Sequence, residues 1–310
     1  MAGAPDPRTY DLEALRRDAL AQSGGAVDDS IPQLADADPE FCAVALALPD
    51  GTVRGSDQSD VTVSIQSAVK PFLFALALLD TDGEALDRIG VEPTGEAFDA
   101  IKLESGTGRP PNPMVNAGAL LTAALVRGDD ADARDARILE GLSAFAGRQL
   151  TVDEDVARNE HLLGDRNHAL AHLMRAEGNL AVSADDAVAV YARACAVLID
   201  AEALAVMGAT LALGGVNPVT GDRVVPAVVA RDVVSVMATC GVYDGSGRWM
   251  RRVGIPAKSS VSGGIVLSAP RCLGAAVLSP PLDEQGTSVR GAYTSKRLSD
   301  DLALHSFGEG

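Results

Sequence analysis

Lysine, aromatic residues and long apolar runs are all scarce in this chain of 310 residues. It has only four lysines and one tryptophan, and aromatic residues make up 4% of the sequence. The longest apolar run, Phe72–Leu79, is far shorter than the roughly 18 residues that a membrane-spanning helix needs. We therefore expect no association with a membrane. The hydrophobic fraction of 47% is nevertheless enough to form a large core.

Positive charge is also in short supply. The chain carries 26 Lys and Arg against 43 Asp and Glu, which gives a net charge of −17. A surface with this balance repels phosphate groups, so we expect no nucleic-acid partner. An acidic, lysine-poor composition fits a protein that works at high salt, and it equally fits a genome whose codons favour arginine. The sequence leaves both interpretations open.

Cysteines are few and widely separated. Cys42, Cys195, Cys240 and Cys272 form no C-x-x-C pair, and each lies among apolar residues. This pattern predicts buried, reduced thiols instead of a zinc site or a disulfide framework. Residues 1–17 lack the basic and apolar segments of a secretion signal, so a cytoplasmic protein is predicted.

Strand patterns lie at the two ends of the sequence, and helical patterns fill the middle. A helix over 11–22 is followed by a buried strand over 41–48 and a hairpin turn at Asp50-Gly51. Strand character returns after Pro256, and a last helix is expected over 287–304. The charge run at 129–137 predicts a solvated helix start. Further strands are expected over 263–269 and 273–279, and helices over 67–80, 116–127, 131–146, 166–176, 184–198, 200–213 and 226–238.

Terminal strands can form one sheet only if the two ends of the chain come together. The helical middle then lies beside that sheet as a second lobe, which is an α+β arrangement with a cleft between the lobes. Because no repeat or linker is visible, we predict a single domain over 1–310. Its α/β lobe would comprise about 25–80 and 225–310, and its helical lobe about 81–224.

The segment Ser67-Ala68-Val69-Lys70 is the first candidate for chemistry. Pro71 fits only the first turn of a helix, which places the helix start near Ser67 and puts Ser67 and Lys70 on one face. A lysine in this position can accept the serine proton and so generate an acyl-serine nucleophile without histidine. The motif alone is weak, because S-x-x-K arises often by chance.

A second lysine motif supports the first. Lys258-Ser259 enters a strand and continues to Gly263-Gly264, which matches the element that serine acyl-enzymes place opposite their nucleophile. A solvated lysine in a turn is the alternative reading of this segment, but it is less favoured in a chain with so few lysines.

Two histidines raise the question of a metal. His168 and His172 are four residues apart on a predicted helix, and His161 or Glu160 are near enough in sequence to join them. The pattern lacks the glutamate of H-E-x-x-H, so core or surface histidines are the better interpretation. We expect no metal and no other cofactor.

The sequence resembles the serine-dependent glutaminases from about Ile31 to Leu282. The family implies a serine β-lactamase-like fold and the hydrolysis of L-glutamine to L-glutamate and ammonia, and its members are usually oligomers, which implies a homodimer or homotetramer. The segments that carry the resemblance are IPQLA (31–35), QSAVKP (66–71), NPMVNAGA (112–119), GDRNHA (164–169), YARAC (191–195), GGVNPVTG (214–221), TCGVYDGSG (239–247) and GIPAKSSVSGGI (254–265).

The resemblance also implies which residues contact the substrate. The ammonium of glutamine needs an anion, its carboxylate needs donors and its amide needs an acyl-transfer centre. Glu160 fits the first need, and Asn116, Asn167 and Tyr191 fit the second. The implied catalytic group is Ser67, Lys70, Tyr243 and Lys258, and the implied substrate contacts are Ser67, Asn116, Glu160, Asn167, Tyr191, Tyr243 and Val261.

Two other functions remain open. A related Ser-Lys amidohydrolase or a β-lactam-type acyl-enzyme would share the fold and the nucleophile, because the pocket and not the fold sets the substrate. A glutamine-binding protein with little or no catalysis is the third class, and the presence of Ser67, Lys70, Tyr243 and Lys258 argues against it.

One position departs from the family pattern. Glutaminases usually have Asp-Tyr-Ile-Pro before the IPQLA-like segment, and that tyrosine contacts the substrate, whereas this chain has Ser30 there. Serine is too short to reach the same place. We therefore expect weaker glutamine binding, unless Ser30 lies in a surface loop away from the site.

Overall fold

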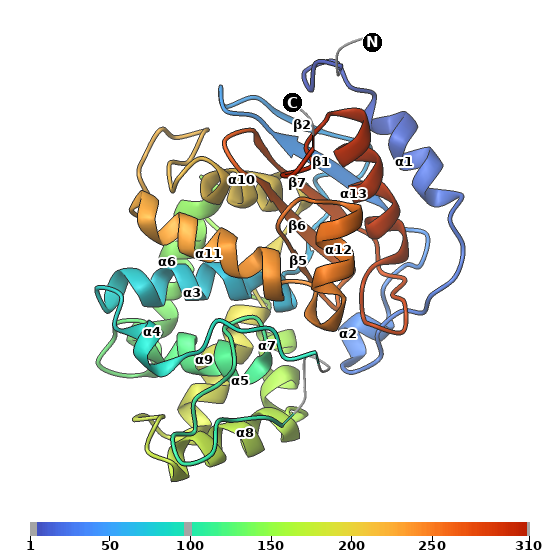
Figure 1. The fold of residues 1–310 in the computed structure, drawn as a ribbon. Coiled ribbons are helices and arrows are strands. Elements are labelled where there is room, and N and C mark those ends of the chain that lie inside the picture. The colour runs from blue at the N-terminus through green and yellow to red at the C-terminus, as the bar shows by residue number, and fades with distance from the viewer. Residues whose placement is uncertain (1–4, 96–100, 309–310) are drawn as a thin grey trace.

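The computed structural model describes residues 5–95 and 101–308 and contains one five-stranded antiparallel sheet in the order β2-β1-β7-β6-β5. β1 pairs with β7, from Ala43 opposite Leu278 to Ala47 opposite Gly274. The two ends of the chain therefore meet in one sheet, as predicted (Figure 1). The strands are β1 (Ala43–Ala47), β2 (Val53–Gly55), β5 (Ala257–Ser259), β6 (Gly264–Ala269) and β7 (Leu273–Leu278).

Alternate residues of the strands face two different cores. Val44 and Val277 pack with Leu12, Trp249 and Leu298 on one face, which is covered by α1 (Leu12–Leu20), α12 (Ser246–Arg252) and α13 (Val289–Asp301). The opposite face packs against α10 (Ala201–Ala212). β1, β6 and β7 therefore alternate between the two cores, which is the period-two pattern of a sheet covered on both sides.

α10 lies close enough to the sheet to require glycine at the contact. A β-carbon at Gly274 would lie 2.1 Å from the backbone nitrogen of Ala209, and one at Gly208 would lie 2.5 Å from the carbonyl oxygen of Leu267. No side chain fits in either gap.

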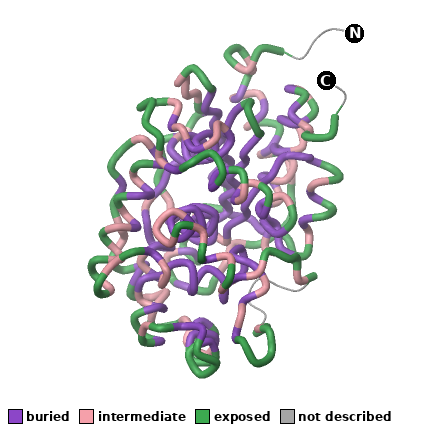
Figure 2. Tube along the Cα trace, turned by 60° about the vertical axis from the view of Figure 1, so that its left-hand side comes forward, coloured by how far each residue is buried: buried purple, intermediate pink, exposed green. Residues whose placement is uncertain are grey.

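Several of the remaining helices surround α3 (Lys70–Asp80), whose residues 70–78 are all buried. Phe72 of α3 meets Phe145 with a centroid distance of 5.2 Å. Figure 2 shows the buried residues running through the middle of the molecule. The elements that pack against α3 are α4 (Ala85–Arg88), α5 (Asn116–Leu125), α6 (Ala131–Ala146) and α11 (Ala227–Cys240). α9 (Ala184–Cys195) packs against α5 and α6, and α7 (Glu154–Leu162) and α8 (Asp165–Ala176) pack against α9.

The predicted helix over 131–146 has the bounds of α6. Its start is fixed by Asp130, whose side chain accepts a hydrogen bond from the backbone N–H of Ala133 at 2.8 Å. Its end is fixed by Gly147, which has a φ of 68° and so provides the left-handed residue that closes many helices. The charge run at 129–137, which includes the first turns of this helix, is not wholly solvated, because Asp135 and Arg137 are half-buried. Asp135 forms an ion pair with Arg193, and Arg137 forms one with Asp80.

Several predicted elements need correction. The helix expected over 184–198 ends at Cys195, and β4 (Leu198–Ile199) pairs instead with β3 (Val63–Ser64). The sequence also did not predict α7, α12 or the short α4 and α2 (Pro32–Ala35). Cys42, Cys195 and Cys240 are buried free thiols as expected, but Cys272 is exposed because it lies in the turn between β6 and β7.

Among the described residues, no helix is long and apolar enough to cross a membrane.

Candidate active site

Ser67 lies where a tight helical turn becomes an α-helix. It belongs to the 3₁₀ turn η1 (Gln66–Val69), and Lys70 is the first residue of α3, with Pro71 in the first turn as predicted. Gln66 has a φ of 50°, an unfavourable value for a residue with a long side chain. This strain sets the direction in which the chain enters the turn that holds Ser67, and such strain is common at functional sites.

Lys70 is fully buried and is held by two asparagines from other helices. Its Nζ donates a hydrogen bond to Oδ1 of Asn116 at 2.7 Å, and Nδ2 of Asn116 donates to Oδ1 of Asn167 at 3.0 Å. Asn116 is the first residue of α5, and Asn167 lies near the start of α8. Three helices thus converge on the Lys70 ammonium.

Lys258 and Tyr243 lie on the other side of Lys70. Nζ of Lys258 is 3.9 Å from the centroid of the Tyr243 ring, and Nζ of Lys70 is 5.7 Å from the same point. Lys258 also donates to the carbonyl oxygen of Ser259 at 2.6 Å. Burial lowers the pKa of Lys258 well below its usual value, and the nearby charge of Lys70 lowers it further.

The end of β5 is tied to the segment that precedes Ser67. Oγ of Ser260 donates to the carbonyl oxygen of Ile65 at 2.9 Å, and it also lies 3.0 Å from Oγ of Ser262. Because Val261 follows Ser260 and Ser67 follows Ile65 by two residues, this bond holds the two segments side by side. Val261 and Ser67 line the same cavity.

That cavity has a volume of about 380 Å³ and collects most of the predicted site. Lys70, Tyr243 and Lys258 do not line it, although the lysines and the phenol form one cluster beside it. Ser30 lines it too, so this position is not a surface loop away from the site. The predicted site residues in its wall are Ser67, Asn116, Glu160, Asn167, Tyr191 and Val261.

Glu160 is the acidic group of the cavity that the sequence singled out. Burial raises its pKa, the hydrogen bond with the Gln66 side chain opposes that rise, and the charge of Asp28 adds to it. Tyr191 is buried beside it, and burial raises the pKa of its phenol as well. The cavity therefore combines three acidic residues, Glu160, Asp28 and Asp165, with Arg166 and with neutral donors.

Other residues of the cavity wall were missed by the sequence interpretation. Asp28, Gln66 and Cys195 line it, and burial raises the pKa of the Cys195 thiol to about 12. Gln66 and Cys195 lie inside the segments 66–71 and 191–195 that carry the family resemblance. Their closeness in sequence to Ser67 and Tyr191 could therefore have identified them as site residues. Residues 164–166 of the wall lie inside the quoted segment 164–169 and so had the same signal, whereas Leu163, which follows the unpredicted α7, lies outside it.

The structure does not bring together the two histidines, His168 and His172, that the sequence pattern had suggested as a possible metal-binding pair. His172 is exposed, whereas His168 contacts His161 of α7 and not its helix neighbour. Asp185, which the sequence did not single out, completes the group.

The sequence model of the glutaminase family matches residues 25–307. The chain belongs to the glutaminase family.

Relatives of known name and structure agree with this assignment. The glutaminase of Clavibacter michiganensis subsp. michiganensis is 72% identical over 306 residues, covering 98% of this chain and 94% of that protein. The crystal structure of Mglu in its glutamate form is 45% identical with a TM-score of 0.92, covering 96% of this chain and 70% of that one. The probable glutaminase YbaS is 37% identical with a TM-score of 0.92, covering 98% and 99%. The glutaminase fold described here is therefore the serine β-lactamase-like fold that was expected.

Proposed function

We propose that this glutaminase hydrolyses L-glutamine to L-glutamate and ammonia through an acyl-serine intermediate. The observation that carries the proposal is the arrangement around one cavity: Ser67 in its wall, Lys70 buried one helical turn away, and Glu160 in the same wall. A nucleophile with an adjacent base and an anion for an amino group are what a free amino-acid amide requires.

Ser67 is the proposed nucleophile and Lys70 its base. Oγ of Ser67 attacks the side-chain amide carbon while its proton passes to Nζ of Lys70. The tetrahedral intermediate collapses when a proton from Lys70 or Tyr243 reaches the amide nitrogen, so that ammonia leaves and a γ-glutamyl ester remains on Ser67. Water then attacks the ester, Ser67 recovers its proton, and glutamate is released.

The negative charge that forms on the amide oxygen needs donors. We assign these to the backbone N–H groups of Ser67 and Val261, which the Ser260–Ile65 hydrogen bond holds near one another. Val261 acts in this account through its backbone, so its side chain is free to vary.

Lys258 influences the protonation state of Lys70, the proposed base, because the two buried amines compete for a proton. Two buried lysines close to one phenol ring are not readily protonated at the same time, because burial and like charge both disfavour the charged form. Burial and the charge of Lys70 accordingly lower the pKa of Lys258. We propose that the two lysines share one proton, so that Lys70 is neutral in the state that accepts the Ser67 proton.

The amino-acid end of glutamine is recognised by the opposite wall. The Glu160 carboxylate binds the ammonium, and Asn116, Asn167 and Tyr191 supply donors for the carboxylate. The Asn116–Asn167 hydrogen bond links this recognition wall to Lys70, because Asn116 contacts both.

Hydrolysis of L-glutamine, L-asparagine and a chromogenic cephalosporin at equal concentrations tests the substrate, with ammonia release as the readout for the two amino acids and the colour change as the readout for the cephalosporin. Turnover of glutamine alone supports the proposal. Preference for asparagine or the cephalosporin would favour a related amidohydrolase or a β-lactam-type acyl-enzyme. Glutamine binding in calorimetry without ammonia release would indicate a binding protein.

We further propose that the protein is a single domain that acts in the cytoplasm as a homodimer or homotetramer, and that its reaction uses no metal or other cofactor. The proposal rests on the family resemblance and on the proposed chemistry of Ser67 and Lys70, in which a serine nucleophile and a lysine base carry the reaction. Light scattering after size exclusion tests the oligomer, and one cooperative unfolding transition tests the single domain. Activity that survives dialysis against chelator tests the independence from metal.

A further inference from the structure

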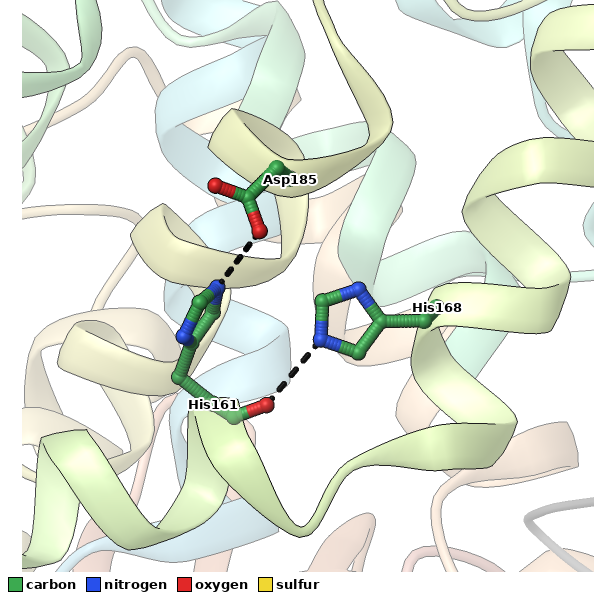
Figure 3. A group of neighbouring side chains, drawn as sticks. All are labelled: His161, His168 and Asp185. Carbon is green, nitrogen blue, oxygen red and sulfur yellow. Dashed lines mark hydrogen bonds and ion pairs between the residues drawn. The ribbon is translucent and has the colours of Figure 1, made fainter.

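Two histidines and an aspartate meet at one place on the helical side of the molecule. His161 lies in the last turn of α7, His168 in α8 and Asp185 in the first turn of α9. One ligand atom from each lies within 4.8 Å of the other two. Figure 3 shows the three side chains pointing toward one another from three separate helices.

The hydrogen bonds of this group favour metal ligation. One ring nitrogen of His168, Nε2, lies 3.0 Å from the carbonyl oxygen of His161. A carbonyl oxygen can only accept, so Nε2 carries the proton and Nδ1 keeps its lone pair. Figure 3 shows Nδ1 on the edge of the ring that is turned away from His161, so the His168 ring must rotate to present this nitrogen to an ion. A histidine that donates its other N–H to a backbone carbonyl is the usual arrangement of a metal ligand.

The remaining two ligands are already paired. Nε2 of His161 is 2.9 Å from Oδ1 of Asp185 (Figure 3). When a metal replaces the proton between them, the neutral His161 ring carries its proton on Nδ1 and presents Nε2 to the ion. The Asp185 side chain is 74% exposed, which leaves it room to adjust and leaves the ion a path from solvent.

We propose that His161, His168 and Asp185 form a zinc-binding site that clamps α7, α8 and α9 together. Two imidazoles and one carboxylate are a set that Zn²⁺ prefers, and water completes the four-coordinate sphere. Harder cations such as Mg²⁺ select oxygen ligands and are excluded by this chemistry.

The site is adjacent to the cavity. His161 follows Glu160, His168 follows Asn167, and residues 163–166 between the two ligands line the cavity wall. A bound ion would therefore hold both ends of this wall. This site is separate from the proposed reaction, which uses no metal.

Calorimetric titration of the tag-free protein with ZnCl₂ tests the site, since a polyhistidine tag would itself bind zinc. A Cys272→Ser background removes the exposed thiol as a competing ligand. We expect one equivalent to bind, with affinity lowered at least tenfold by His168→Gln and by Asp185→Asn. His172→Gln is the matched control on the same helix and should bind as the parent does.

Amide hydrogen exchange tests the clamp. Zinc should slow exchange over residues 160–168 in the parent and in His172→Gln, but not in His168→Gln. Absence of binding, equal affinity in His168→Gln, equal binding of Mg²⁺, or unchanged exchange would each overturn the proposal. None of these measurements depends on glutamine turnover, so failure of the proposed function and failure of the zinc site are distinguishable.

Discussion

Nζ of Lys258 lies 3.9 Å from the centroid of the Tyr243 ring, and both side chains are buried. Tyr243 itself has a φ of 50°, so its backbone is held in an unfavourable conformation at the point where it meets the lysine. Together with Lys70, these residues form a cluster of proton-carrying groups beside the cavity that contains Ser67. The cluster is the centre of the proposed chemistry.

The lowered pKa of Lys258 predicts a specific dependence of stability on pH. Between that lowered pKa and the ordinary value of about 10.5, the unfolded chain holds a proton on Lys258 that the native protein lacks. Stability therefore rises with pH across this window and is flat, for this residue, below it. Lys258→Met should reduce the slope of unfolding free energy against pH by up to about 1.4 kcal/mol per pH unit. Urea titrations from pH 7 to 10 measure it, and equal slopes would contradict the assignment.

Asn116→Asp tests the contact with Lys70. The carboxylate would still accept from Nζ of Lys70, but its charge would hold that lysine in the protonated form, which cannot accept the Ser67 proton. We expect kcat to fall about 10²-fold or more at pH 7, the scale of general-base contributions, and the acidic limb of the kcat profile to move to higher pH. A variant with lower kcat but an unmoved limb would show that Asn116 does not act through Lys70.

Glu160→Gln tests ammonium recognition. A hydrogen bond to a charged group contributes about 1.5–3 kcal/mol, so KM for glutamine should rise about 10- to 150-fold. Because burial raises the pKa of Glu160, KM of the native protein should also rise as pH falls through that value, and the variant should lose this dependence.

Asp155→Asn is the control for this variant. It removes one negative charge from the same helix at an exposed position, so KM should stay within twofold of the native value. An equal effect of both variants would mean that the net charge, and not a contact at Glu160, governs binding.

Ser30→Tyr tests the departure from the family pattern. Ser30 lines the cavity and its hydroxyl contacts the Asp28 carboxylate, so a phenol here can reach toward the bound amino acid. We expect KM to fall by about tenfold or more with a smaller change in kcat, because the contact is on the non-reacting end of the substrate. If both constants stay within twofold, the family contact is replaced by another residue in this protein.

The parts of the fold that could be predicted are those with local signals. The bounds of α6 follow from Asp130 and Gly147, which have side-chain and backbone roles that are visible in sequence. α7 has an equally good start, since Asp153 accepts from the backbone N–H groups of Asp155 and Val156, but its low content of apolar residues concealed it. Beyond the end of α9, Val197 forms a β-bridge with Val152 and Leu198 begins β4, because strand pairing overrides the helical pattern there.

The composition of the site could be predicted, but its assembly could not. The cavity brings together six of the predicted residues from segments between 67 and 261, and nothing in the spacing fixes such distances. The stacking of Lys258 on Tyr243 and the Lys70–Asn116–Asn167 chain depend on how four helices and β5 pack. The meeting of His161, His168 and Asp185 is likewise a product of tertiary structure.

The acyl-serine intermediate is tested most directly by hydroxylamine. If glutamine forms an ester on Ser67, adding hydroxylamine should divert part of the product from glutamate to γ-glutamyl hydroxamate, while one ammonia is released for each acyl group transferred. The account predicts both products for the native protein and neither for a folded Ser67→Ala variant. Hydroxamate formation or ammonia release by Ser67→Ala within tenfold of the native rate would contradict the account.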